Sequence, residues 1–271
     1  MATLTAAAVA VLETANPAEK IARTHEAANL WRRGTLSEVG TASPPDRPAR
    51  PERPRLLPPR EMPKRRAGGE HGNRVALLHA IAHIELNAID LASDLIARFA
   101  SPDLPRAFFD DWVAVADEEA THHGLLTTRL AELGAAYGDL PAHDGLWEAA
   151  SATAEDLLAR LAVVPLVLEA RGLDVTPAMI ERLEASGDQR SAEILRIIYR
   201  DEISHVAAGR RWFAFEAARR ALSPVETYHA LVRRYFGAAL KAPFNERARS
   251  EAGFPPAFYA PLVAMNERRR R

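Results

Sequence analysis

Helical periodicity dominates this chain from residue 73 to about residue 221. Apolar residues recur every three or four positions there, and no stretch of any length alternates as a strand would. Prolines and glycines divide the pattern into segments. We predict long helices over about 73–100, 106–133, 144–171 and 188–221. A short helix is expected over 172–187, started by Thr176-Pro177 after a stop at Gly172.

Helices of this length are typical of a bundle. Four segments of about 28 residues would each measure about 40 Å, the size of a four-helix bundle. The link from Gly134 to Gly145 can reach roughly 40 Å when extended, far enough to return the chain along the bundle. The pattern therefore predicts an all-α four-helix bundle with one long crossover.

The segments on either side of the bundle differ in character. Residues 1–36 carry a helical pattern with a break at Asn16-Pro17, and the Pro-rich stretch 43–63 favours an extended arm that wraps the surface. A further helix is expected over 224–241, followed by an irregular tail. The predicted organisation is an N-terminal helical segment and arm (1–70), a bundle (71–222), and a C-terminal helix and tail (223–271).

Composition narrows the chemistry. The chain has no cysteine, which excludes disulfides, thiolate metal sites and a cysteine nucleophile. Its net charge of −1 argues against general affinity for nucleic acid, so we interpret the basic runs at 64–66 and 268–271 as solvated tails rather than RNA contacts. The N-terminus lacks a basic n-region and no apolar run reaches roughly 20 residues, so we expect a cytoplasmic protein without membrane association.

Two copies of one acidic motif carry the strongest chemical signal. In each half of the predicted bundle, a lone glutamate on one helix is followed by Glu-x-x-His on the next. The spacing from lone Glu to motif Glu is 34 residues in the first half and 33 in the second, which indicates an internal duplication. The residues are Glu85, Glu119 and His122 in the first half, and Glu169, Glu202 and His205 in the second.

The spacing suits metal ligands because residues i and i+3 face the same side of a helix. The four glutamates also sit among apolar residues on their helices, and a buried carboxylate without a partner costs several kcal/mol. Two divalent cations would neutralise all four. A single Glu-x-x-His is common and means little alone, and the competing interpretation is glutamates on solvated faces. The repetition favours a metal site.

This arrangement resembles the ferritin-like superfamily, in which two helices each give one Glu and two others each give Glu-x-x-His. The segments LLHAIAHIELNAIDLASD, DDWVAVADEEATHHGLL, AYGDLPAHDGLW, EARGLDVTP and DEISHVAAGRRWF resemble a bacterial ferritin-like family of unknown function. The site pattern is similar to that of di-iron tRNA hydroxylases. The resemblance implies that Glu119 and Glu202 bridge two ions, with Glu85–His122 and Glu169–His205 as terminal sets.

Residues beside the ligands have expected roles too. Metal-bound imidazoles donate their other N–H to a carboxylate or carbonyl, so the resemblance implies that Glu118 and Asp201 orient the ligand histidines. Tyr199 lies one turn before Glu202 and is interpreted as near the metals, with packing as the leading alternative. His79, His83 and His123 are interpreted as structural neighbours rather than ligands.

The function implied is O2-dependent oxidation or hydroxylation of an organic substrate, by a di-iron oxidoreductase that takes electrons from an external donor. Iron oxidation or peroxide detoxification, and a metal-stabilised bundle that acts as a binding protein, stay open as alternatives. Mn/Fe and Mn/Mn centres accept the same ligands as Fe/Fe. The substrate, the reductant and assembly as a homodimer are left undecided by the sequence.

Overall fold

The computed structural model describes residues 3–62 and 69–263. Within these ranges the chain is helical and contains no strand beyond two isolated bridges, Leu56 with Ala142 and Leu240 with Val263. The chain forms two compact units, residues 1–148 and 149–271. The boundary falls inside 71–222, so each half of the predicted bundle range belongs to a different unit.

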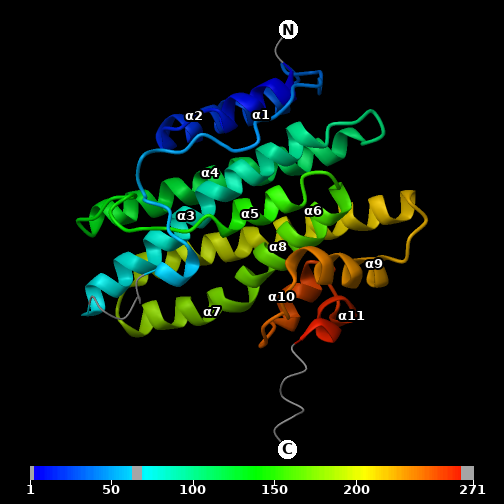
Figure 1. The fold of residues 1–271 in the computed structure, drawn as a ribbon. Coiled ribbons are helices and arrows are strands. Elements are labelled where there is room, and N and C mark those ends of the chain that lie inside the picture. Colours follow the sequence, from blue (N-terminus) through cyan, green and yellow to red (C-terminus); the bar gives the residue numbers. More distant parts are fainter. Residues whose placement is uncertain (1–2, 63–68, 264–271) are drawn as a thin grey trace, which may run out of the picture. The chain divides into compact units, whose positions relative to one another are not determined.

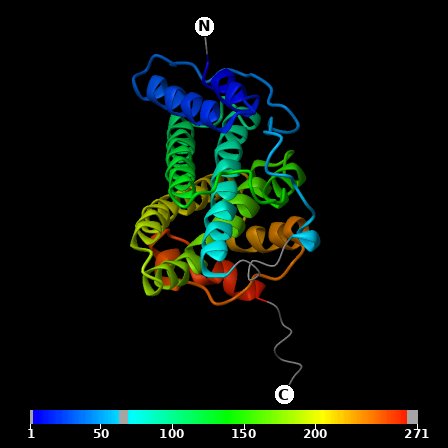
Figure 2. The ribbon, with the colours of Figure 1, turned by 90° about the vertical axis from the view of Figure 1, so that its left-hand side faces the viewer.

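The first unit is built on a helical hairpin, in which α3 (Gly69–Arg98) and α4 (Arg106–Glu132) pack along each other (Figure 1). Two shorter helices lie across this hairpin, with α1 (Leu4–Leu12) against α3 and α2 (Pro17–Arg32) against α4 (Figure 2). The bounds of both long helices agree with the prediction within about four residues. The left-handed Gly134, with φ of +73°, follows the end of α4 as expected for a helix stop.

The break between α1 and α2 lies where the sequence predicts it. The Asn16 side chain accepts hydrogen bonds from the backbone N–H groups of Ala18 and Glu19, at 2.9 and 3.1 Å. Pro17 occupies the first helical position, where its missing N–H costs nothing. These two residues therefore cap α2 and turn the chain back over the hairpin.

The Pro-rich segment runs over the first unit as an extended arm, apart from one short turn, η1 (Pro59–Glu61). The Ala49 N–H donates to the Leu12 carbonyl, and the Leu57 N–H donates to that of Ala142. Arg98 donates to the Pro45 carbonyl. These three hydrogen bonds tie the described part of 43–63 to the first unit.

One helix, His71–Arg98, is long and apolar enough to cross a membrane by length and composition alone. However, 67% of its most apolar stretch is buried inside the structure. Leu86 and Ile89, both 0% exposed, pack with Val11 of α1 and Ala120 of α4 in the core of this unit. The apolar character of α3 is therefore that of a central core helix.

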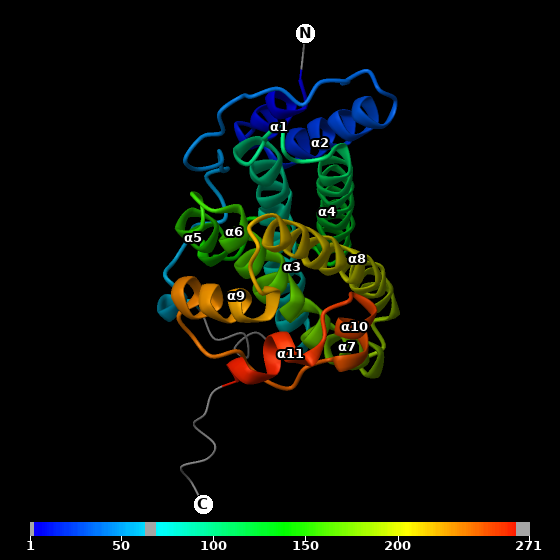
Figure 3. The same ribbon diagram turned by 90° about the vertical axis from the view of Figure 1, so that its right-hand side faces the viewer.

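The second unit is built around α8 (Gln189–Arg219), which packs against α7 (Ala170–Ala185) (Figure 3). Asp188 caps α8 through the Ser191 N–H at 3.0 Å. The remaining elements are α5 (Gly145–Ala152), which begins in the first unit, α6 (Leu157–Val163), the π-helix η3 (Val164–Glu169), α9 (Pro224–Leu231), the π-helix η4 (Val232–Phe236), α10 (Glu246–Glu251), α11 (Pro256–Tyr259) and the 3₁₀ turn η5 (Ala260–Leu262).

The prediction of one helix over 144–171 and another over 172–187 is wrong. The chain breaks earlier, after α5, and Asp156 caps the new helix by accepting from the Leu158 N–H at 3.0 Å. From there the helix continues through Gly172 to Ala185, so neither Gly172 nor Thr176-Pro177 marks a boundary.

The helix α7 passes through Pro177 because a distant residue compensates for it. Proline lacks the N–H that would pair with the carbonyl of Leu173 four residues earlier. The Asn245 side chain donates to that carbonyl instead, at 3.1 Å. A hydrogen bond from the C-terminal segment therefore keeps the helix intact where the local sequence indicates a break.

The C-terminal region also differs from the prediction. The helix expected over 224–241 ends at Leu231 and continues only as the π-turn η4 to Phe236. The tail expected to be irregular contains α10 and α11, and Phe254 and Phe258 are buried. Tyr228 of α9 lies edge-on to both rings, so aromatic packing fixes these short helices. The basic runs 64–66 and 268–271 lie outside the described residues.

Candidate metal centre

The hairpin α3–α4 brings the first predicted ligand set together. Glu85 comes from α3, while Glu119 and His122 come from adjacent positions on one face of α4. Their exposed fractions are 3%, 0% and 0%. The same helices also supply core residues of this unit, including Leu86 from α3 and Ala120 from α4. Packing of the hairpin therefore carries these polar groups into the core.

The three side chains converge through specific atoms. His122 Nδ1 lies 3.3 Å from Glu85 Oε2 and 3.5 Å from Glu119 Oε2. One ligand atom from each residue lies within 4.8 Å of the other two. Charged hydrogen bonds are shorter, at about 2.7–2.9 Å. Donor atoms that share a cation at about 2.0–2.2 Å lie roughly 3.0–3.5 Å apart. The observed spacing thus fits a shared cation.

The pKa values in this cluster reflect the repulsion between two buried carboxylates. Burial raises the pKa of Glu85 well above its ordinary value, and the charge of Glu119 raises it further, against the opposing effect of His122. Burial lowers the pKa of His122, but Glu119 and Glu85 outweigh it and raise the value to about 11. Protons therefore stabilise the cluster where a cation would otherwise do so.

The chemistry of the donors fits a divalent metal ion of intermediate hardness. Two carboxylates and one imidazole bind iron, manganese or zinc well, and the site lacks the soft sulfur ligands that select copper. Glu85 Oε2 is buried and makes no hydrogen bond within the described part of the chain. An acceptor left in this state costs free energy that a bound cation would recover. Glu85, Glu119 and His122 could therefore hold a metal ion.

The second unit places the matching motif on α8. Glu202 and His205 are 9% and 0% exposed, and His205 Nδ1 lies 3.8 Å from Glu202 Oε1. The same ring nitrogen faces a carboxylate in both units. Glu169, the remaining predicted ligand, is the last residue of the π-helix η3 and is half-buried. It is the least enclosed of the six.

The residues expected behind the ligands have contacts of their own. Asp201 accepts a hydrogen bond from Arg200 Nε at 2.9 Å. The Tyr199 hydroxyl accepts from Asn245 Nδ2 at 2.8 Å. Glu118 is half-buried on α4. The roles of Glu118 and Asp201 in orienting the histidines stay predictions, and the contact of Tyr199 ties it to the C-terminal segment.

His79, His83 and His123, interpreted from the sequence as structural neighbours, form hydrogen bonds with the protein. His83 Nδ1 is hydrogen-bonded to the Tyr137 hydroxyl at 2.8 Å, and its Nε2 faces the His143 carbonyl at 3.2 Å. His123 Nδ1 donates to the Ala82 carbonyl at 2.7 Å. His79 stacks on Tyr137 at 5.4 Å between ring centroids. Burial lowers the pKa of His83 to about 3, so its ring is neutral.

Sequence reasoning missed a buried ion network in the same unit. Lys20 of α2 and Asp90 of α3, both 0% exposed, form an ion pair. Arg50 of the arm lies 2.6 Å from the other Asp90 oxygen and donates to Asn87 at 2.6 Å. Lysine is rare in this arginine-rich chain, and that rarity was the available signal. The network anchors the arm and α2 to α3.

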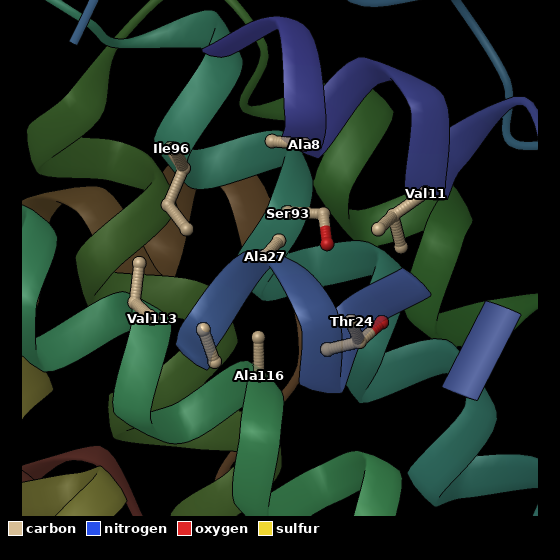
Figure 4. Close-up of a pocket in the computed structure, with 9 residues that line it drawn as sticks. Ala8, Val11, Thr24, Ala27, Ser93, Ile96, Val113 and Ala116 are labelled. Carbon is tan, nitrogen blue, oxygen red and sulfur yellow. The ribbon is translucent and has the colours of Figure 1, made fainter. Parts of the chain in front are cut away.

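A pocket lies between the four helices of the first unit (Figure 4). It has about 270 Å³ of empty space, part of it open to solvent. Its lining is small and mainly apolar, with the hydroxyls of Thr24 and Ser93 as the polar groups, and none of the predicted ligands belongs to it. The residues are Ala8, Val11, Thr24, Ala27, Ala28, Ser93, Ile96, Val113 and Ala116. The candidate metal ligands therefore do not line this pocket.

All-helical architecture with a buried carboxylate–histidine cluster defines this chain as a candidate metal-binding helical protein. It belongs to the family described as "Protein of unknown function (DUF455)", whose model matches residues 13–260. It is 46% identical over 209 residues to an "Uncharacterized protein" of Haemophilus influenzae. The aligned residues make up 75% of this chain and 72% of that relative. No solved structure matches the chain.

Proposed function

We propose that this protein is a carboxylate-bridged dinuclear metal protein of ferritin-like design, to which each of the two units contributes one half of the ligand set. One observation carries the proposal: Glu85, Glu119 and His122 converge in the core, and the same Glu-x-x-His motif recurs in the second unit. Each unit pairs a helix with one Glu and a helix with Glu-x-x-His, which is the arrangement of di-iron bundles.

The proposal divides the six residues between two ions. Glu119 and Glu202 would bridge them, while Glu85–His122 and Glu169–His205 would each complete one ion. Four carboxylates balance two divalent cations, so the assembled core is neutral with neutral histidines. Glu118 and Asp201 would accept the second N–H of each imidazole and fix its orientation.

Iron is the metal that this ligand set favours for chemistry with O2, with Mn/Fe and Mn/Mn as the other pairs it accepts. Two bound ferrous ions would supply electrons that activate O2 for oxidation or hydroxylation of an organic substrate. The chain contributes preorganised ligands from the core, where Glu85, Glu119 and His122 are 3%, 0% and 0% exposed. An external electron donor and a cytoplasmic setting complete the proposal.

Elemental analysis tests the metal site. Protein purified without added metal should contain two equivalents of iron or manganese per chain, and the double variant Glu119→Gln, Glu202→Gln should contain none. Glu216→Gln is the matched control, because this buried carboxylate is held by Arg219 and Arg220 instead. If the double variant still contained metal, the proposed centre would be contradicted.

Reaction with O2 tests the chemistry. The reduced, iron-loaded chain should consume O2 in single turnover, and the apoprotein should not. If O2 uptake matched the oxidation of added Fe²⁺ alone and large cages formed in solution, iron storage would replace oxidation of an organic substrate as the function.

A further inference from the structure

The π-helical turn η3 is the local feature that decides where Glu169 points. A π-turn pairs residues i and i+5, so it holds one more residue than an α-turn. Everything beyond it is rotated by roughly 100° relative to an uninterrupted α-helix. Pro165 lies at the start of η3 and lacks the N–H that an α-turn would use. Glu169 is its last residue, so its direction depends on this turn.

The neighbouring helix α8 carries a glycine, Gly209, where the turn η3 packs against it. A Cβ atom on Gly209 would lie 2.4 Å from Pro165 Cβ and 2.7 Å from its Cγ, closer than real carbon atoms approach. Glycine is therefore required at position 209, not for its backbone angles but for the close approach of Pro165. The two helices contact each other directly at this point.

Two buried side chains from the C-terminal segments bind carbonyls on either side of Glu169. The Tyr228 hydroxyl, 0% exposed, donates to the Leu166 carbonyl at 3.1 Å. Arg249, 2% exposed, donates to the Ala170 carbonyl at 3.2 Å. The same guanidinium pairs with Asp174 at 2.7 Å, one turn further along α7. These donors satisfy backbone groups on both flanks of the ligand.

We propose that Gly209, Tyr228 and Arg249 are positioning residues for a metal ligand: together they hold η3 in its π-helical form and direct the Glu169 carboxylate to its metal ion. This inference rests on the proposed dinuclear centre. It adds that the C-terminal segments, which carry none of the six ligands, determine the affinity of the half-site that contains Glu169 and His205.

Titration with Co²⁺ alone, followed by visible absorption, tests the inference, because the spectrum reports ligand geometry without any need for turnover. Gly209→Ala places a methyl against Pro165 and should displace the turn. It should weaken binding of one of the two Co²⁺ ions by roughly tenfold to a hundredfold and alter its spectrum. The matched control is Gly172→Ala in α7, where an added Cβ meets nothing within 4 Å.

A second matched pair covers the case in which Gly209→Ala fails to fold. Tyr228→Phe removes only the hydroxyl that binds Leu166. Tyr259→Phe removes a buried hydroxyl that makes no hydrogen bond within the described residues. For Tyr228→Phe we expect roughly tenfold weaker binding of one Co²⁺ ion. For Tyr259→Phe we expect the Co²⁺ affinity of the wild type.

The outcomes separate this inference from the proposal beneath it. If the wild-type chain bound no Co²⁺, both would fall. If it bound two ions and the Tyr228 and Gly209 variants matched their controls in affinity and spectrum, the positioning role alone would be overturned. A variant that only melted earlier, with unchanged Co²⁺ binding, would show that these residues serve the fold and not the ligand.

Discussion

Replacing Glu85 by Gln should change stability in opposite directions with and without metal. Without metal, the Glu85 carboxylate is 3% exposed and lies with Glu119 in the same cluster, so its charge is costly to bury there. The amide has the same shape but no charge, and the metal-free variant should be more stable than the wild type. With metal, the amide removes one anionic ligand, and the variant should lose most of the stabilisation.

The size of the metal effect follows from linkage. A metal at 100 times its Kd stabilises the folded chain by about 2.7 kcal/mol. For a protein of this size that corresponds to a rise in Tm of about 5–10 °C. Replacing the anionic Glu85 ligand by a neutral amide should weaken binding by roughly 100-fold, the upper end of the range for altered metal-site residues. At the same metal concentration the variant would gain only about 0.4 kcal/mol, a rise in Tm of about 1–2 °C.

Thermal unfolding monitored by circular dichroism measures both effects, in chelator-treated protein with and without Mn²⁺. The control is again Glu216→Gln, which leaves Arg219 and Arg220 without their carboxylate. It should lower the Tm without metal and leave the Mn²⁺-induced rise unchanged. The reasoning is refuted if metal-free Glu85→Gln melts below the wild type, or if Mn²⁺ raises the Tm of both equally.

Three further predictions concern stability. Lys20→Met should lower the free energy of unfolding in urea by about 3–5 kcal/mol, because it removes a buried partner of Asp90. Adding Asp90→Asn should recover part of that loss. A single variant as stable as the wild type would contradict this. Asn16→Ala should cost about 1 kcal/mol through loss of the α2 cap, and an unchanged urea midpoint would contradict it. Burial raises the pKa of Glu216, but its arginine partners lower it on balance below the ordinary 4.5. Its contribution is therefore present above pH 4.5 and lost as pH falls through the lowered value, so the stability gap between wild type and Glu216→Gln should close in acid and stay open at neutral pH.

The sequence predicted the helices whose ends are set locally. Asn16-Pro17 and Asp188 cap helices by themselves, and Gly134 accepts a left-handed conformation, so these boundaries were accessible from neighbouring residues. The third helix was not predictable in this way. Its continuation through Pro177 depends on Asn245, far away in the chain, and its π-turn has no periodic signature distinct from an α-helix.

The candidate site also has a part that the sequence predicts and a part that only the fold reveals. Residue type and spacing were enough to identify Glu85, Glu119 and His122, because one helix face carries the pair and a hairpin brings the third. What supports the site was invisible in the sequence. Lys20–Asp90 pairs residues from separate helices through geometry that only the folded unit defines. Spacing predicts ligands on one helix, whereas contacts between helices require the fold.

The bond from Asn245 to the Leu173 carbonyl spans 72 residues. At about 5–20 residues per second, the ribosome needs roughly 4–14 s to make that length of chain. During this interval α7 lacks the amide that bridges its proline. Nascent chains halted before position 245 should therefore contain a frayed α7 that proteases can cut, and chains extended well beyond Asn245 should resist the same cut.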